Sequence, residues 1–279
     1  MNLLVLPMDI ADLRVVLGWA KEEGWKPGDG DAEPFLAADP GGFLIGRLDG
    51  EPVASVSGVR YGRGYGFIGL YICRPEFRGR GYGLTMFRKV MDMLGDRVIG
   101  LDGVLAQVPN YQRSGFATAY GNMRHAAQLS LDAPSDPRLR PVDAALIPAI
   151  KAFDRAHVPE PRDGFLDVWL TGDDRTAIAL VEDGAVAGYG VIRDADDGYR
   201  IGPLFAANEA DADALFRALC AARPGGMIYL DIPVPNAAAR ALTARYGMEP
   251  MFETARMYRG PAPALPLDRI FGVTTLEVG

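Results

Sequence analysis

The residues of this sequence with the clearest chemical meaning form the loop Arg78-Gly79-Arg80-Gly81-Tyr82-Gly83. Alternating glycines allow consecutive backbone N–H groups to point into one concavity, and a helix predicted to begin near Gly81 adds the positive end of its dipole. Arg78 and Arg80 place permanent charge beside it, and guanidinium groups suit phosphate oxygens. The loop is therefore predicted to bind a diphosphate, although Gly-Arg-Gly alone is equally compatible with a solvated surface loop.

Elements on both sides must position this loop. The apolar run Tyr65–Ile72 precedes it, and apolar residues at helical spacing follow it: Leu84, Phe87, Val90, Met91 and Leu94. Upstream, Phe43–Leu48 and Val53–Arg60 flank an Asp-Gly turn, and a Gly-Arg-Gly turn leads into Tyr65–Ile72. These are hairpin signals and predict antiparallel strands. A dinucleotide-binding Rossmann unit would need helical crossovers at the same places, so the sequence favours a different fold.

At this point the chain resembles the GNAT superfamily, the acyl-CoA-dependent N-acyltransferases. In that family Arg-Gly-x-Gly-x-Gly/Ala follows the fourth strand and binds the CoA diphosphate, and Arg78–Gly83 matches it position by position. Downstream, Tyr111-Gln-Arg-Ser-Gly115-Phe116 is similar to the family's Tyr-x-x-x-Gly-Phe, whose tyrosine commonly protonates the departing thiolate. The resemblance implies acetyl-CoA as cosubstrate and Tyr111 as general acid.

The same resemblance implies a thioester site between two splayed strands. Ile72 and Cys73 would offer backbone hydrogen bonds to the pantetheine arm, and the Cys73 thiol is expected to pack in the strand because no histidine lies near it in sequence. Many members carry a glutamate on the fourth strand that takes the amine proton, but Tyr65–Ile72 contains no acid. Asp102, where the predicted fifth strand Val98–Leu101 ends, is the nearest candidate base; a turn-forming aspartate is equally compatible.

Acceptor contacts are expected at the end of the first helix. After a predicted strand, Met1–Leu6, a helix with one apolar face follows Asp9 and ends near Glu22, Glu23 and Trp25. In GNAT proteins the segment between the first helices lines the acceptor site, so these three residues become candidate substrate contacts. A helix end with solvated carboxylates and a packed tryptophan is the alternative. Residues 25–40 have loop composition with room for one short helix.

Bulk properties narrow the class of protein. The chain has 279 residues, 49% hydrophobic and 23% charged, which suits two ordinary globular domains. Its net charge of −7 argues against a nucleic-acid partner. No run approaches the roughly 18 apolar residues of a membrane span, and no basic secretory n-region is present. Two cysteines give no disulfide framework, so a cytoplasmic location is expected. His125 and His157 lack metal-ligand spacing, so no metal is expected.

Four landmarks recur in the same order, displaced by between 132 and 134 residues. They are Pro7-Met8-Asp9 with Pro141-Val142-Asp143, Asp49-Gly50 with Asp183-Gly184, Ile68-Gly69 with Ile201-Gly202, and Gly115-Phe116 with Gly247-Met248. In the second copy, residues 206–213 replace the glycine-rich loop with three acids and no glycine, and Thr243 stands where a tyrosine would be needed. The second copy is therefore predicted to be non-catalytic.

The expected fold is mixed α/β, with two tandem GNAT-like domains, each a mostly antiparallel twisted sheet flanked by helices. Residues 1–131 would form the catalytic domain and residues 138–279 a degenerate domain without a cofactor site, joined by a proline-rich linker. Strand-like segments over Ala117–Leu131 would complete the first domain, and Ile270–Val278 is expected to return as a closing strand of the second. The expected function is transfer of an acetyl group from acetyl-CoA to a primary amine of a small molecule by direct attack. A catalytically silent CoA-binding sensor or interaction protein is the alternative, and a homodimer is left open.

Overall fold

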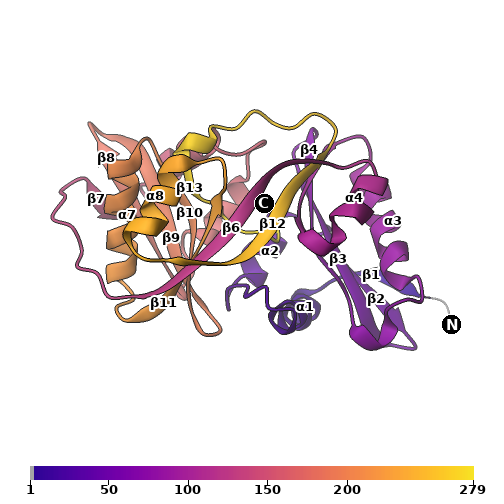
Figure 1. The fold of residues 1–279 in the computed structure, drawn as a ribbon. Helices are drawn as coiled ribbons and strands as arrows, with labels where there is room; N and C mark the ends of the chain where they lie inside the picture. Colours follow the sequence, from indigo (N-terminus) through magenta and orange to yellow (C-terminus); the bar gives the residue numbers. More distant parts are fainter. Residues whose placement is uncertain (1–2) are drawn as a thin grey trace.

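The computed structural model describes residues 3–279, and this part of the chain forms one 13-stranded mixed sheet flanked by helices (Figure 1). The predicted strand at Met1–Leu6 lies partly outside the described residues, and β1 begins at Leu4. The first half contains β1 (Leu4–Pro7), α1 (Ile10–Glu22), α2 (Ala32–Ala38), β2 (Phe43–Leu48), β3 (Glu51–Tyr61), β4 (Tyr65–Cys73), α3 (Tyr82–Leu94), β5 (Val98–Val104), α4 (Val108–Arg113) and β6 (Ala117–Leu129).

The second half repeats this order of elements. It contains β7 (Leu139–Pro141), α5 (Ile147–Asp154), α6 (Asp163–Trp169), β8 (Arg175–Glu182), β9 (Ala185–Ala195), β10 (Gly198–Ala206), α7 (Glu209–Ala221), β11 (Gly226–Pro233), α8 (Ala237–Arg245), β12 (Glu249–Arg259) and β13 (Ile270–Gly272). Short 3₁₀ turns lie at Pro75–Phe77, Leu105–Gln107 and Leu267–Arg269. The hairpins predicted from the turn residues are confirmed, because β2, β3 and β4 pair antiparallel, as do β8, β9 and β10.

The two halves exchange their last long strands. β6, from the first half, pairs with β11 and β12, both from the second half. β12 in turn pairs with β5 of the first half. In Figure 1, β6 and β12 run side by side through the middle of the molecule, between α3 and α4 on one side and α7 and α8 on the other. A cut between residues 131 and 138 therefore separates the sequence repeats but not the folded sheets.

Two boundary predictions are wrong for the same reason. Asp102 does not end the fifth strand, because Ile99–Val104 pair with β12 and β5 continues to Val104. A closing strand was expected over Ile270–Val278, but only Ile270–Gly272 pairs with the sheet. Both depend on partners that lie more than 50 residues away in sequence, which local patterns do not reveal.

Each half has a pair of parallel strands that diverges. β4 pairs with β5 only from Tyr65 to Ile68, so the end of β4 leaves its neighbour. β10 pairs with β11 only from Tyr199 to Ile201. In the second half, β13 enters the gap by pairing with β10, and the Val273 N–H donates to the Asp231 carbonyl of β11. In the first half, the corresponding gap opens into a cleft.

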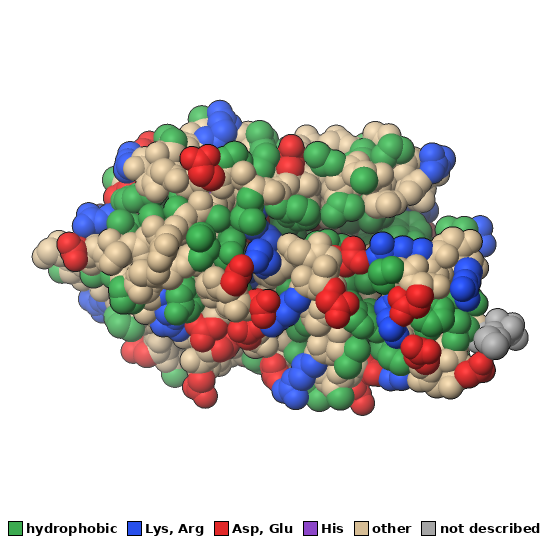
Figure 2. All heavy atoms as spheres, turned by 60° about the horizontal axis from the view of Figure 1, so that its bottom comes forward, with side chains coloured by type: hydrophobic (Ala, Val, Ile, Leu, Met, Phe, Trp, Pro, Cys, Tyr) green, Lys and Arg blue, Asp and Glu red, His purple; other side chains and the backbone are tan. Residues whose placement is uncertain are grey.

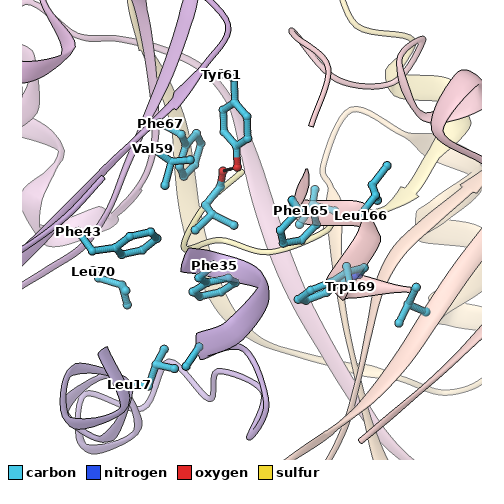
Figure 3. Close-up of a cluster of buried hydrophobic side chains, with 14 of the residues drawn as sticks. Leu17, Phe35, Phe43, Val59, Tyr61, Phe67, Leu70, Phe165, Leu166 and Trp169 are labelled. Atoms are coloured by element: carbon cyan, nitrogen blue, oxygen red, sulfur yellow. Dashed lines mark hydrogen bonds between the residues drawn. The ribbon is translucent and has the colours of Figure 1, made fainter. Parts of the chain in front are cut away.

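A shared hydrophobic core holds the halves together (Figure 3). Phe35 of α2 and Phe43 of β2 stack with ring centroids 6.4 Å apart, and Phe165 and Trp169 of α6 stack at 4.7 Å. All four side chains are buried, and Figure 3 shows the two groups facing each other from opposite halves. Burial of a large aromatic side chain contributes a few kcal/mol, so we expect the halves to unfold together.

Candidate active site

A cleft of about 440 Å³ opens between the splayed ends of β4 and β5. It brings together most of the residues predicted from the sequence: Glu23, Trp25, Ile72, Cys73, Arg78, Gly79, Gly81, Tyr82, Gly83, Asp102 and Tyr111. Arg80 and Glu22 are exposed and do not line it. The second half adds four lining residues that the sequence did not indicate, Phe252 and Thr254 from β12 and Leu276 and Glu277 from the C-terminal tail.

At one end of the cleft, the glycine-rich loop leads into α3. Gly79 and Gly81 have φ values of 75° and 84°, a left-handed backbone that glycine adopts without a side-chain penalty. Gly81 is the N-cap of α3, and among the described side chains none caps this helix. The first-turn N–H groups are thus available to an anion. This geometry suits the diphosphate that the sequence pattern predicts.

The two arginines of the loop differ in their surroundings. The Arg78 Nε donates to the Cys73 carbonyl at 2.8 Å, and its guanidinium also pairs with Glu23. These contacts hold Arg78 at the cleft and connect the loop to the end of α1. The Arg80 guanidinium lies 5.9 Å from the Phe77 ring centre, outside the cleft lining. Any contact of Arg80 with a phosphate would therefore come from the rim.

The wall made by β4 contains a strained residue. Leu70 has a φ of 44°, which costs a non-glycine residue about 1–3 kcal/mol. The register between β3 and β4 shifts at this point, and the Ser55 hydroxyl donates to the Leu70 carbonyl at 2.7 Å. The bulge re-aims the end of the strand, so Ile72 and Cys73 face the cleft on the side that β5 has left. Burial raises the pKa of the Cys73 thiol, which favours packing over a nucleophilic role.

Tyr111, on the short helix α4, is one of the residues that line the cleft. Its ring packs with Phe87 and Phe116, with centroids 6.1 and 6.3 Å away. The ring also lies over Gly103 of β5, where an added Cβ would come within 2.8 Å of it. Burial raises the pKa of the Tyr111 phenol above its usual value, so the hydroxyl is protonated at neutral pH. A protonated phenol is what a proton donor requires.

Asp102 lines the same cleft, but its carboxylate is already bound. The Arg256 guanidinium donates to Oδ1 at 2.9 Å and to Oδ2 at 2.7 Å. The Asn122 amide donates to Oδ1 at 2.8 Å. Both partners come from the exchanged strands β6 and β12, so Asp102 joins the halves whatever else it does. Its role as a general base remains a prediction, and the bidentate contact offers little support for it.

Two buried arginines, one from each half, hold the chain segment that follows α1. Arg124 of β6 donates to the Trp25 carbonyl at 2.6 Å, and Arg200 of β10 donates to the Lys26 carbonyl at 2.7 Å. Both guanidinium groups also bind Asp231 of β11. Although burial alone would raise the pKa of Asp231, the two arginines hold it below its usual range. This network fixes the segment after α1, and so places Trp25 at the cleft.

Glu277 is one of the four lining residues that sequence patterns missed. Its side chain is only 3% exposed, and its Oε1 lies 3.4 Å from the Arg200 Nη1. Its backbone carbonyl presses on Gly69 of β4, where an added Cβ would lie 1.9 Å away. The repeated Ile-Gly pair was a signal of this contact, because Gly202 in the second half meets the carbonyl of Thr274 in the same manner. The sequence alone does not show that the backbone of the C-terminal tail packs against these two glycines.

Other kinds of site find little support. Among residues 3–279, no group of three or more His, Cys, Asp and Glu side chains is placed to hold a metal ion. No helix in the described part of the chain has the length and apolar character needed to cross a membrane. On the face shown in Figure 2, basic and acidic side chains are intermixed. That face therefore offers no continuous basic surface of the kind nucleic acids require.

Comparisons with known proteins agree with this architecture. Residues 10–116 match the Acetyltransferase (GNAT) family, and residues 150–272 match an Acetyltransferase (GNAT) domain. The holothin acyltransferase of Pseudoalteromonas sp. (strain SANK 73390) is 35% identical, over 98% of this chain and 93% of the relative. An uncharacterized N-acetyltransferase of Bacillus subtilis (strain 168), YitH, is 26% identical over 76% of each chain.

Solved structures show the same fold. A putative acetyltransferase from Pyrococcus horikoshii superposes with a TM-score of 0.83 at 19% identity, covering 100% of this chain and 96% of the other. A tandem GNAT protein from the clavulanic acid biosynthesis pathway has a TM-score of 0.63 at 16% identity, over 94% and 100%. With two GNAT matches along one sequence and a full-length acyltransferase relative, the chain belongs to the GNAT family and is of its tandem type.

Proposed function

We propose that this protein is an N-acetyltransferase that moves an acetyl group from acetyl-CoA to a primary amine of a small molecule. The observation that carries the proposal is the continuous cleft from the glycine-rich loop, along the splayed end of β4, to Tyr111 and Trp25. An acyl-CoA has the matching parts in the same order: a diphosphate, a pantetheine arm and a thioester. The acyltransferase relative, which acts on holothin by its name, supports a small-molecule acceptor.

The chain's residues would divide the work along the cleft. The α3 N-terminus and Arg78 would bind the diphosphate, and the backbone of Ile72 and Cys73 would hold the pantetheine arm in the gap. A neutral amine would attack the thioester carbonyl carbon directly. Tyr111 would donate its hydroxyl proton to the sulfur as the carbon–sulfur bond breaks. No covalent enzyme intermediate is needed, which agrees with the raised pKa of the Cys73 thiol.

A CoA-binding sensor or interaction protein is the second candidate. It is favoured by the absence of an acid in the β4 sequence and by the bound state of the Asp102 carboxylate. Such a protein would need the loop and the gap but no proton acceptor.

A cytoplasmic location and a homodimer also stay predictions.

An amine-panel assay distinguishes the two. The full chain is incubated with acetyl-CoA and, separately, with primary amines, aminoglycoside-like polyamines, amino acids and peptide N-termini. Free thiol release is followed, and products are identified by mass. We expect acceptor-dependent thiol release matched by an acetylated product for at least one small amine. Tight CoA binding by calorimetry with no release for any acceptor would favour the sensor.

A further inference from the structure

The C-terminal tail, residues 273–279, has no regular secondary structure, yet it is buried between the halves. Figure 1 shows the C-terminus at the centre of the molecule. The Tyr61 hydroxyl donates to the Val278 carbonyl at 2.8 Å, and Arg162 donates to the Gly279 carbonyl at 3.2 Å. The Thr275 hydroxyl accepts from the Val278 N–H at 3.0 Å. These contacts from both halves define one path for the tail.

That path crosses both diverging strand pairs. The carbonyls of Val273 and Thr274 lie against Gly202 of β10, within 2.6 and 2.4 Å of an added Cβ. The Glu277 carbonyl lies against Gly69 of β4, next to the strained Leu70. The tail thus fills the gap of the second half and ends as a wall of the cleft in the first. Only glycine allows so close an approach of two backbones.

The side chain of Glu277 ends in an oxygen that no described group uses. Within residues 3–279, Oε2 is buried and has no hydrogen-bond partner, while Oε1 lies 3.4 Å from Arg200. A buried carboxylate oxygen without a hydrogen-bond partner is energetically unfavourable. Glu277 is one of the residues that line the cleft, together with Trp25 and Phe252. Asp102, by contrast, has both oxygens bound.

We propose that Glu277 is the carboxylate that binds the acceptor's amine and takes its proton, an inference that rests on the proposed acyl transfer. The amine nitrogen would donate an N–H to Oε2 and form the new bond to the thioester carbon. The carbon–sulfur bond breaks, the nitrogen's proton passes to the Glu277 carboxylate, and the sulfur receives the Tyr111 proton. The products are an amide and a free thiol, so atoms and charges balance. The second half would then supply a reacting group to the first.

The charges of the cleft narrow the acceptor further. Among its described lining residues the acids are Glu23, Asp102 and Glu277. Arg78 pairs with Glu23, Arg256 binds Asp102, and Arg200 lies 3.4 Å from Glu277 Oε1, which leaves Glu277 Oε2 buried without a partner. An acceptor with a carboxylate next to its amine would bring a second negative charge toward Glu277. Two neighbouring carboxylates repel each other in a partly buried site. The expected acceptor is therefore an amine without an adjacent carboxylate.

The test compares E277Q with wild type. Glutamine keeps the shape of the side chain but cannot take the proton, so we expect kcat/KM for the acceptor to fall about 10²–10⁴-fold. CoA affinity, measured by calorimetry, should stay the same, because Glu277 packs against Gly69 of β4 and is not part of the glycine-rich loop. The matched control is E182Q, an exposed β8 glutamate that pairs with Arg138 and should leave kcat/KM unchanged. E277D should restore part of the activity.

Two outcomes would overturn the proposal while leaving the acyltransferase function intact. One is an E277Q enzyme with wild-type kcat/KM, whatever its thermal stability, because a purely structural glutamate would affect Tm alone. The other outcome concerns the wild-type enzyme: an equal kcat/KM for an α-amino acid and for the corresponding amine that lacks the carboxylate. We expect about a tenfold or greater preference for the latter. If wild type releases no thiol with any acceptor, the proposed function itself fails, and this inference fails with it.

Discussion

At the scale of single residues, Tyr111 combines burial of its ring with a place in the lining of the cleft. Its hydroxyl carries a proton at neutral pH because burial raises the phenol pKa. Removing the hydroxyl in Y111F leaves the ring packed on Gly103 and between Phe87 and Phe116. We expect kcat to fall by roughly 10²-fold with CoA affinity nearly unchanged. Steady-state kinetics with calorimetry checks this, and an unchanged kcat would remove Tyr111 from the mechanism.

The residues of the candidate site differ in how readily the sequence reveals them. Arg78 to Gly83 are consecutive, so their spacing alone predicts the loop at a helix N-terminus. Tyr111 comes from a second short motif. Glu277 has no such motif, because its place depends on the path of a tail through contacts with both halves. Asp102 was recognised, but its partner Arg256 lies 154 residues away on an exchanged strand, so its ion pair could not be foreseen.

At the scale of elements, the N-termini of α3 and α7 show what the second half has lost. α3 starts after Gly81, whose left-handed backbone leaves the helix end open. α7 starts after Asn208, whose side chain accepts from the Asp211 N–H at 3.0 Å. Glu209 and Asp213 then add negative charge beside this helix end and pair with Arg245. An anion would find free donors at α3, but a side-chain cap and acids at α7.

Substitution of Gly81 tests the α3 loop. G81V places a β-branched residue at a φ of 84°, which costs about 1–2 kcal/mol, and adds a side chain where phosphate must approach. We expect CoA binding to fall below detection by calorimetry. G184V is a matched control, because Gly184 has a φ of 81° and equally open space around it but lies in a distant turn. Equal loss of CoA binding in both variants, or tight binding in G81V, would contradict this assignment.

The elements that follow from short-range patterns were predicted well. Turn residues set the antiparallel hairpins, and apolar spacing set α1 and α3. Strand ends and strand order were not predicted. β5, for example, continues to Val104 because β12 is its neighbour. Likewise β6 was recognised as a strand, while its pairing with β11 and β12 depends on how the two halves dock. The repeat predicts two similar halves, but it contains no information about which half receives each final strand.

At the scale of the whole molecule, the second half has structural uses that need no cofactor. β12 closes the sheet beside β5 and gives Phe252 and Thr254 to the cleft. Arg200 of β10 donates to the Lys26 carbonyl and so helps to hold the segment that carries Trp25. The second half therefore contributes to the structure of the cleft although it lacks the glycine-rich loop. Its residues form part of the wall of the first half's cleft.

The same arrangement predicts that one chain binds one CoA. β13 and Val273 occupy the gap between β10 and β11 that corresponds to the open gap between β4 and β5. A pantetheine arm in the second half would have to displace paired backbone, and a diphosphate would meet the capped, acidic end of α7. Both effects oppose binding, and neither is present in the first half.

Titration calorimetry of the full chain should therefore give a stoichiometry of one CoA per chain. N208A removes the side-chain cap of α7 and is expected to cost about 0.5–2 kcal/mol of stability while leaving CoA affinity and stoichiometry as in wild type. G81V should abolish the single binding event instead. A stoichiometry of two would show that the second gap admits the cofactor. Tight CoA binding that remains in G81V and changes when N208A is added would show the same. The C-terminal segment would then have to leave β10, and Glu277 would be expected to move with it, so acyl transfer would fall as the second site filled.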